Sequence, residues 1–347
     1  MLHTDIGPKL ARAAMVFVRD MMCVKKGESV LVTINTGADM TAVNAIQDAA
    51  YLIGAKVSTL ILAPRLPFQG GLADAYVSDT VEAAVTTCDA WIDLCMPYMA
   101  GCHAHDEAMK NGRTRYVLAS DIGADEIVRI FGGADLDALF EFGDIFSELI
   151  EKAEGKTGRV TNAARTDLTF TLAPTKGFAL SKADKPGGYF IPGTVVFLPE
   201  IETVKGQFVT SDVLHEYYVT GFEPMTLILD GDVKEVVGGG PERKVMMRAL
   251  ERAGDGNLGH VVHFTCGFHP TARYTGQCFI EDQRVIGYNA IGLGVPFWEP
   301  GGGENHPDTV IGMQSLWIDG ERILDDGVFV GNARMLDAFK KLTPIYG

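Results

Sequence analysis

Short hydrophobic runs alternate with amphipathic segments through the first half of the chain. The runs that predict buried strands are residues 29–35, 56–63, 90–97 and 115–120. Between them, apolar positions recur with the helical period at residues 39–55 and 81–88. Strands and helices that alternate in this way predict a parallel sheet with helices packed on it, which is a doubly wound α/β domain.

The pattern changes after residue 155. A long helical period spans residues 135–155 and ends at Gly155, a residue type that commonly follows the last turn of a helix. From residue 159 onward, strand-like segments are separated by glycine and proline turns, and one clear helical period remains at residues 242–254. We therefore predict a Rossmann-like α/β domain at residues 1–157 and a mainly β (α+β) domain at residues 158–347.

Composition and charge exclude some classes of partner. A chain of 347 residues is long enough for two domains that each bury a core. The net charge of −15 and the pI near 4.9 disfavour nucleic acid and anionic membranes, since either needs a basic face. No apolar run approaches the length of a membrane span. The six cysteines form no Cys-x-x-Cys pair, which favours reduced thiols in a cytoplasmic protein.

Histidines gather near the end of the chain, beside an acidic residue. Four of the eight histidines fall within residues 260–306. His306 and Asp308 are two residues apart at the start of a predicted strand, so both side chains would point to one face. Together with His263 they supply two imidazoles and one carboxylate, the set that binds non-haem Fe(II) and that zinc can also use. The sequence thus predicts a metal site in the second domain.

A purely structural role is the competing interpretation. His263 lies in the apolar stretch HVVHFTCGFHP, where a lone histidine is more often a hydrogen-bonded core residue than a ligand. Asp308 follows a proline, and an aspartate there is also a common turn residue. The three residues taken together favour the metal site over these separate roles.

Several stretches of the second half resemble those of known metalloproteins. The stretches are PGTVVFLPEIETVKGQFVTSD at 192–212, HFTCGFHPTAR at 263–273, IGLG at 291–294 and NHPDTVIGMQSLWIDGERILDDG at 305–327. They resemble the aminopeptidase T-like metallopeptidases and, more closely at the ligand positions, the 2,5-dihydroxypyridine 5,6-dioxygenases that share the peptidase fold. The first half resembles both groups only in the order of its strands and helices.

Three positions separate these two groups. The peptidases carry a glutamate where this chain has Thr194, and a histidine where it has Ala290. A further peptidase glutamate corresponds to His263, at a spacing where the dioxygenases also have a histidine. The bridging carboxylates that a two-metal peptidase requires are therefore missing. The resemblance implies instead a mononuclear Fe(II) site formed by His263, His306 and Asp308.

The resemblance also implies a reaction and further functional residues. It implies extradiol-type ring cleavage of a hydroxylated aromatic or N-heteroaromatic compound by dioxygen, with a dihydroxypyridine as one candidate substrate. His103 is the candidate acid–base residue, because it follows the predicted strand 90–97 and imidazole titrates near neutral pH. Arg273 and Glu304 are candidates for binding an anionic substrate.

Other interpretations stay open. An exposed helix start is the alternative role for the segment around His103. Residues 175–193 should line the substrate, yet they lack the matching carboxylate and histidine of the dihydroxypyridine enzymes, which leaves the compound open. A metal-dependent hydrolase with one zinc and a non-catalytic relative with a vestigial site are the alternative functions. Dimers are usual in both resembling groups, so we expect a homodimer or a higher homo-oligomer.

Overall fold

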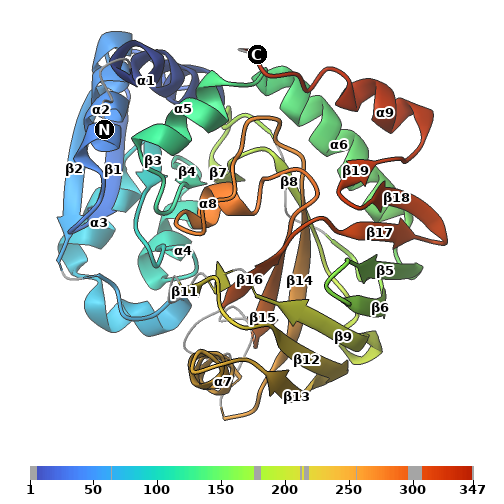
Figure 1. The fold of residues 1–347 in the computed structure, drawn as a ribbon. Coiled ribbons are helices and arrows are strands. Elements are labelled where there is room, and N and C mark those ends of the chain that lie inside the picture. Colours follow the sequence, from blue (N-terminus) through green and yellow to red (C-terminus); the bar gives the residue numbers. More distant parts are fainter. Residues whose placement is uncertain are drawn as a thin grey trace.

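Two bodies of structure lie side by side in the computed structural model (Figure 1). The described residues are 6–63, 65–175, 181–211, 213–214, 219–254, 256–295 and 307–345. A sheet with its helices, drawn in blue and teal, forms one body, and strands drawn mainly in green to red form the other. The short helix α8 (Phe279–Asp282) lies between them in this view.

The first sheet is entirely parallel, as the sequence predicts. Its strand order is β2-β1-β3-β4-β7. The strands are β1 (Ser29–Asn35), β2 (Lys56–Leu62), β3 (Ala90–Asp93), β4 (Arg115–Leu118) and β7 (Gly187–Phe190). The α-helices of this body are α1 (Ile6–Met15), α2 (Met40–Ile53), α3 (Asp79–Thr87), α4 (His103–Lys110) and α5 (Ala124–Gly132). A π-helical turn at Val16–Met21 and a 3₁₀ segment at Gly70–Tyr76 complete it.

Helix α2 begins and ends where the sequence supplies caps. The side chain of Asp39 accepts a hydrogen bond from the backbone N–H of Thr41, which satisfies one of the free donors of the first turn. The helix ends at Gly54, whose φ of 88° lies in the left-handed region that favours glycine. The buried residues of α2 recur three and four positions apart, so one face of the helix enters the core.

The second sheet is antiparallel and contains fourteen strands among the described residues. Its order is β11-β10-β16-β15-β14-β13-β12-β9-β6-β5-β17-β18-β19, and β8 pairs with β14 beside this path. The strands are β5 (Thr157–Thr161), β6 (Asp167–Thr171), β8 (Thr194–Phe197), β9 (Lys205–Thr210), β10 (Val213–Leu214), β11 (Val219–Thr220), β12 (Met225–Asp230), β13 (Asp232–Gly238), β14 (His260–Gly267), β15 (Asn289–Gly294), β16 (Asp308–Ile311), β17 (Ser315–Ile318), β18 (Glu321–Asp325) and β19 (Val328–Phe329). The remaining helices are α6 (Leu136–Lys152), α7 (Arg243–Ala253), α9 (Ala333–Phe339) and a 3₁₀ turn at Ile201–Thr203. The predicted mainly β second half is confirmed.

Each body contains one element from the other side of the predicted domain boundary between residues 157 and 158. Strand β7 belongs to the second half of the chain, yet it pairs in parallel with β4 and completes the first sheet. Helix α6 belongs to the first half, yet its Phe142 packs 4.8 Å from the ring of Phe268 in the second core. The two bodies are therefore joined by more than one crossing of the chain.

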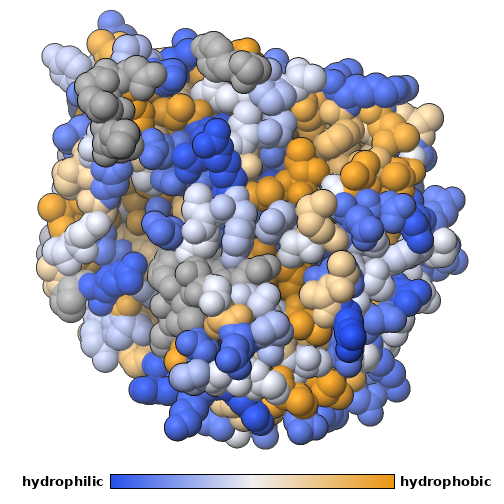
Figure 2. Space-filling view, in the orientation of Figure 1, coloured by the Kyte–Doolittle hydropathy of each residue, from blue (hydrophilic) through white to orange (hydrophobic). Residues whose placement is uncertain are grey.

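The outer face of the second body carries part of the exposed apolar surface. Figure 2 shows apolar side chains gathered over the region of α9 and the β18–β19 hairpin. Val328 in β19 is 60% exposed and Val330 directly after it is 41% exposed. None of the helices in the described ranges combines the length and the apolar character needed to traverse a membrane.

Candidate metal centre

His263 and Asp308 meet on one face of the second sheet. His263 on β14 pairs with Gly292 on β15, and Gly292 pairs with Asp308 on β16. The Nε2 atom of His263 lies 3.2 Å from Oδ1 of Asp308, and the two side chains are 14% and 6% exposed. Neighbouring strands are about 4.8 Å apart, so side chains two strands apart meet only when the residue between them leaves room. Glycine at position 292 leaves that room.

A β-bulge sets the direction of His263. The register between β14 and β15 shifts between Val261 and His263, so Val262 is the extra residue on β14. Bulges of this kind re-aim the side chains that follow them. Without the extra residue, alternation would pair Val262 with Gly292 and turn His263 to the opposite face. The bulge therefore puts the imidazole on the same face as Asp308.

The donor set of this pair suits a first-row metal ion. One imidazole nitrogen and one carboxylate oxygen at 3.2 Å match two ligands that each lie about 2.0–2.2 Å from a shared ion. His306 and Glu304 lie outside the described residues, so the predicted third ligand is not placed. Within the described residues no group of three His, Cys, Asp or Glu side chains is arranged to hold a metal. The described part of the chain thus contains two of the three predicted ligands.

Two stacked tyrosines lie beside the His263–Asp308 pair. The rings of Tyr274 and Tyr288 have centroids 5.2 Å apart and an interplanar angle of 27°. Both pack against Ala290 and Val310, which are paired across β15 and β16. Ala290 and Val310 are two residues from Gly292 and Asp308, so they share a face with them about 7 Å along the strands. The tyrosines therefore form an aromatic wall next to the pair.

Tyr98, in the first body, interacts electrostatically with Asp308 of the second. Burial raises the pKa of Tyr98, and the negative charge of Asp308 raises it further, which places the phenol within electrostatic reach of that carboxylate. Tyr98 is 8% exposed and follows the carboxyl end of β3. The order of the sheet reverses between β1 and β3, and α/β sheets bind ligands outside the strand ends at such a point. The sequence alone gave no signal for Tyr98, because its partner lies 210 positions away.

Asp93 holds the turn that presents Tyr98. Its Oδ1 accepts hydrogen bonds from the Thr33 hydroxyl at 2.8 Å and from the Cys95 N–H at 3.1 Å. Its Oδ2 accepts from the Met99 N–H at 2.8 Å and from the Tyr116 hydroxyl at 3.0 Å. Burial raises the pKa of Asp93, while these donors stabilise its charge. One fully buried carboxylate thus fixes both ends of residues 95–99.

A known family matches most of the chain. The sequence matches the family described as NicX, 2,5-dihydroxypyridine 5,6-dioxygenase, over residues 13–331. The chain belongs to this dioxygenase family. No curated protein sequence matches it significantly.

Solved structures share the fold of this dioxygenase family member. The 2,5-dihydroxypyridine dioxygenase from Pseudomonas putida KT2440 is similar with a TM-score of 0.76 and 19% identity, over 94% of this chain and 98% of that one. Wild-type AmpT from Thermus thermophilus is similar with a TM-score of 0.61 and 16% identity, over 93% of this chain and 99% of that one. At these identities the two structures show the fold alone.

The predicted acid–base residue of the family member, His103, lies at the surface. Its side chain is 58% exposed, and its Nε2 atom is 3.9 Å from Oε2 of Glu82 on α3. Its backbone N–H donates to Oδ1 of Asp74 at 2.7 Å. The nearby His105 is only 17% exposed, and its ring lies edge-on to Tyr116 at 4.7 Å. None of the described contacts joins His103 to His263 or Asp308, so its acid–base role stays a prediction.

The structure also describes the substrate-binding candidate Arg273 and the discriminating positions Thr194 and Ala290. Arg273 is exposed, and its backbone N–H donates to Oε1 of Glu281 at 3.0 Å. Thr194 is 4% exposed on β8, where it pairs with Gly267, and Ala290 is fully buried on β15. Neither Thr194 nor Ala290 offers a carboxylate or an imidazole. These two positions therefore supply no ligands for a second metal ion.

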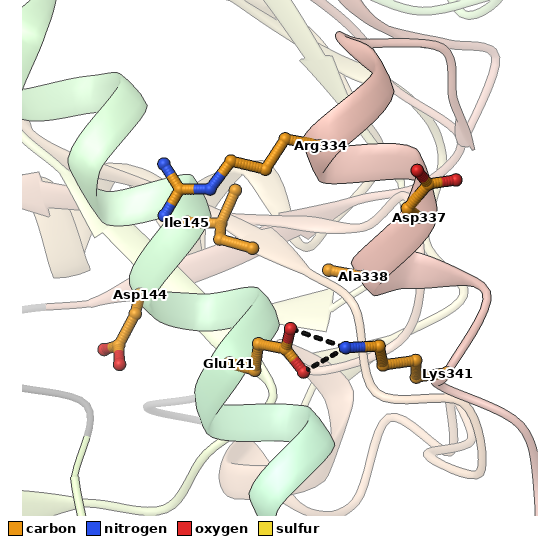
Figure 3. Close-up of a pocket in the computed structure, with 7 residues that line it drawn as sticks. All are labelled: Glu141, Asp144, Ile145, Arg334, Asp337, Ala338 and Lys341. Carbon is orange, nitrogen blue, oxygen red and sulfur yellow. Dashed lines mark hydrogen bonds and ion pairs between the residues drawn. The ribbon is translucent and has the colours of Figure 1, made fainter.

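A hollow of about 550 Å³ lies away from this centre, between α6 and α9 (Figure 3). Its lining residues are Glu141, Asp144, Ile145, Arg334, Asp337, Ala338 and Lys341. Lys341 pairs with Glu141 at 2.6 Å, and Arg334 pairs with Glu148 at 2.6 Å. Both pairs are exposed, and they join α6 to α9 and to the residues directly after it, so the hollow is a surface groove that ion pairs bridge.

Proposed function

We propose that the chain is a mononuclear non-haem Fe(II) dioxygenase that cleaves the ring of a hydroxylated aromatic or N-heteroaromatic compound. The observation that carries this proposal is the 3.2 Å approach of His263 to Asp308 over Gly292, in a member of a dioxygenase family. His263, Asp308 and the neighbouring His306 would hold the ion. When bound, Fe(II) in such a set offers adjacent positions for a substrate hydroxyl and dioxygen.

The residues around the pair fit a planar, hydroxylated ring. Tyr274 and Tyr288 present aromatic surface on one side, and aromatic rings favour offset stacking with each other. Tyr98 adds a buried phenol that feels the charge of Asp308. His103 is the proposed acid–base residue, and Arg273 is proposed to bind an anionic substrate together with Glu304. The aromatic surface of the two tyrosines supports an aromatic substrate over a peptide.

A dihydroxypyridine is the first candidate substrate. The family description supports it, since the match covers residues 13–331. The segment 175–193 contains Asp184 but lacks a carboxylate and a histidine that match those expected in the dihydroxypyridine enzymes, so we propose the class of compound before the compound itself. A panel of hydroxylated pyridines and catechols therefore belongs in the test.

Metal analysis and oxygen uptake test the proposal together. We expect protein purified without oxygen to contain iron, and to consume oxygen with at least one hydroxylated pyridine or catechol. His263→Ala and Asp308→Ala should abolish both metal retention and oxygen uptake, because each removes a donor. His260→Gln is the matched control, since its Nδ1 atom lies 4.0 Å from Oδ1 of Asp232 instead. Stoichiometric zinc with no oxygen uptake would favour the hydrolase alternative.

The predicted homodimer has its own measurement. Sedimentation at micromolar concentration should give twice the chain mass of 37.5 kDa or a higher multiple. A monomer throughout that range would contradict the expectation of a homo-oligomer.

A further inference from the structure

The short helix α8 is docked on the first body by an aspartate of that body. The Asp121 carboxylate accepts hydrogen bonds from the backbone N–H of Phe279 at 2.8 Å and of Ile280 at 3.4 Å. Asp121 itself has a φ of 56°, a left-handed conformation that aspartate tolerates better than most residues. The start of α8 is thereby fixed to the loop between β4 and α5.

An ion pair that is mostly buried joins α5 to the same helix. Arg129 on α5 binds Glu281 on α8 through Nε to Oε1 at 2.5 Å and Nη2 to Oε2 at 2.7 Å. The Glu281 side chain is 0% exposed and that of Arg129 is 18% exposed. Bidentate pairing of this kind fixes orientation as well as distance. Nη2 of Arg129 also donates to Oε1 of Glu126 at 2.7 Å, which anchors the guanidinium on its own helix.

The two acidic residues of α8 hold the segment that carries Tyr274. Oε1 of Glu281 accepts from the backbone N–H of Arg273 at 3.0 Å. Oδ1 of Asp282 accepts from the backbone N–H of Thr275 at 2.8 Å and of Gly276 at 3.2 Å. The residues on both sides of Tyr274 are therefore tied to α8.

We propose that Arg129 and Glu281 are positioning residues that set Tyr274 as the aromatic wall of the ring-binding site. The inference rests on the proposed function, because it assigns how that same site holds its ring. Tyr274 stacks on Tyr288 beside Ala290 and Val310, one step along the strands from the His263–Asp308 pair. The chain of contacts runs from α5 through Glu281 to the backbone of Arg273, and then to the ring of Tyr274. Tyr274 is the specificity-determining residue in this arrangement.

Three substitutions separate the wall from the device that positions it. Tyr274→Leu removes the aromatic face, whereas Tyr274→Phe keeps it. Glu281→Gln keeps the shape of the side chain but loses the charge that binds Arg129, and Arg129→Lys loses the fork that binds both oxygens. Arg159→Lys is the matched control, because Arg159 makes the same bidentate contact with Asp167 at 2.8 Å on the exposed face of β5 and β6.

The test measures binding of 2,5-dihydroxypyridine to the iron-loaded protein without oxygen, and amide hydrogen exchange of residues 271–277 in the metal-free protein. We expect Tyr274→Leu, Glu281→Gln and Arg129→Lys to weaken binding about tenfold, with iron content unchanged. Glu281→Gln and Arg129→Lys should also speed exchange at residues 271–277. Tyr274→Phe and Arg159→Lys should match the wild type in both measurements.

Each outcome decides between the two proposals. Suppose that the wild type binds the ring compound and that the Glu281 and Arg129 variants match it in both binding and hydrogen exchange. That result overturns the positioning role and leaves the proposed function standing. A wild type that takes up iron but binds neither 2,5-dihydroxypyridine nor any other compound of the panel of hydroxylated pyridines and catechols contradicts the proposed function, and with it the inference. If Glu281→Gln does not fold, Arg129→Lys decides the question, because it retains a cation opposite the buried carboxylate.

Discussion

Nε2 of His263 lies 3.2 Å from Oδ1 of Asp308, although strand β15 runs between the strands that carry them. The contact passes over Gly292, the residue that pairs with both. A Cβ atom at position 292 would point to the same face as the imidazole and the carboxylate. The approach of the two donors therefore depends on the absence of a side chain there.

Gly292→Ala should lower the iron content at least about tenfold while the protein stays folded, because the added methyl separates the two donors. Metal analysis after anaerobic loading measures the effect, and circular dichroism checks the fold. Gly7→Ala is the control, since a Cβ at Gly7 meets nothing within 4 Å. Full iron content in Gly292→Ala would show that the pair does not bind the ion jointly.

Asp93→Ala should lower the free energy of unfolding by about 2–5 kcal/mol, because four buried donors would lose their acceptor. Denaturant unfolding measures this loss. Asp167→Asn, at an exposed position of strand β6, is the control, and its 52% exposed side chain predicts a change of about 1 kcal/mol or less. A loss below about 1 kcal/mol for Asp93→Ala would mean that the Tyr98 turn is held by other contacts.

The sequence predicts the parallel sheet well and the joining of the two bodies poorly. Strand β1 is buried along nearly its whole length, so its continuous apolar run is a strong local signal. Strand β7 is a four-residue segment that includes two glycines, and it pairs with β4 some 72 positions earlier in the chain. No local hydrophobic pattern can indicate this pairing, because β7 becomes a strand only through its pairing with β4.

The candidate site shows the same division. His263 and Asp308 could be paired from the sequence, because their residue types and the resemblance both indicate a ligand set. The bulge at Val262 could not, since it depends on how β14 aligns with β15. The electrostatic interaction of Tyr98 with Asp308 depends on how the two bodies pack, and a single sequence carries no pattern for that.

His269 should make the stability of the protein sensitive to acid. Burial lowers its pKa to about 3, and it is 1% exposed with Nε2 donating to the Ile130 carbonyl at 3.0 Å. An unfolded histidine has a pKa of about 6.5, so protons bind the unfolded chain first. The contribution of His269 to the free energy of unfolding therefore keeps its full value above about pH 6.5, and it falls as the pH drops from there toward about 3.

His269→Gln should remove this part of the pH dependence. Between about pH 6 and 4, the wild-type free energy of unfolding should fall relative to the variant by about 1.4 kcal/mol per pH unit. Urea unfolding of both proteins across this range gives the difference directly, and the other titrating groups cancel in it. Parallel curves would show that His269 accepts a proton in the folded protein.

Thr194→Glu should not create a peptidase. Thr194 is buried on β8, and Ala290, where the sequence resemblance predicts a peptidase histidine, offers no donor atom in its side chain. His263 stands where a further peptidase glutamate is expected, so one restored carboxylate leaves a second ion without enough ligands. We expect one metal per chain in both wild type and variant, even in excess zinc or cobalt, and negligible release of amino acids from peptides. Thr194→Gln is the matched control, because it adds the same bulk without the charge. A second bound ion together with peptide cleavage in Thr194→Glu alone would instead place the chain one substitution away from the two-metal hydrolases.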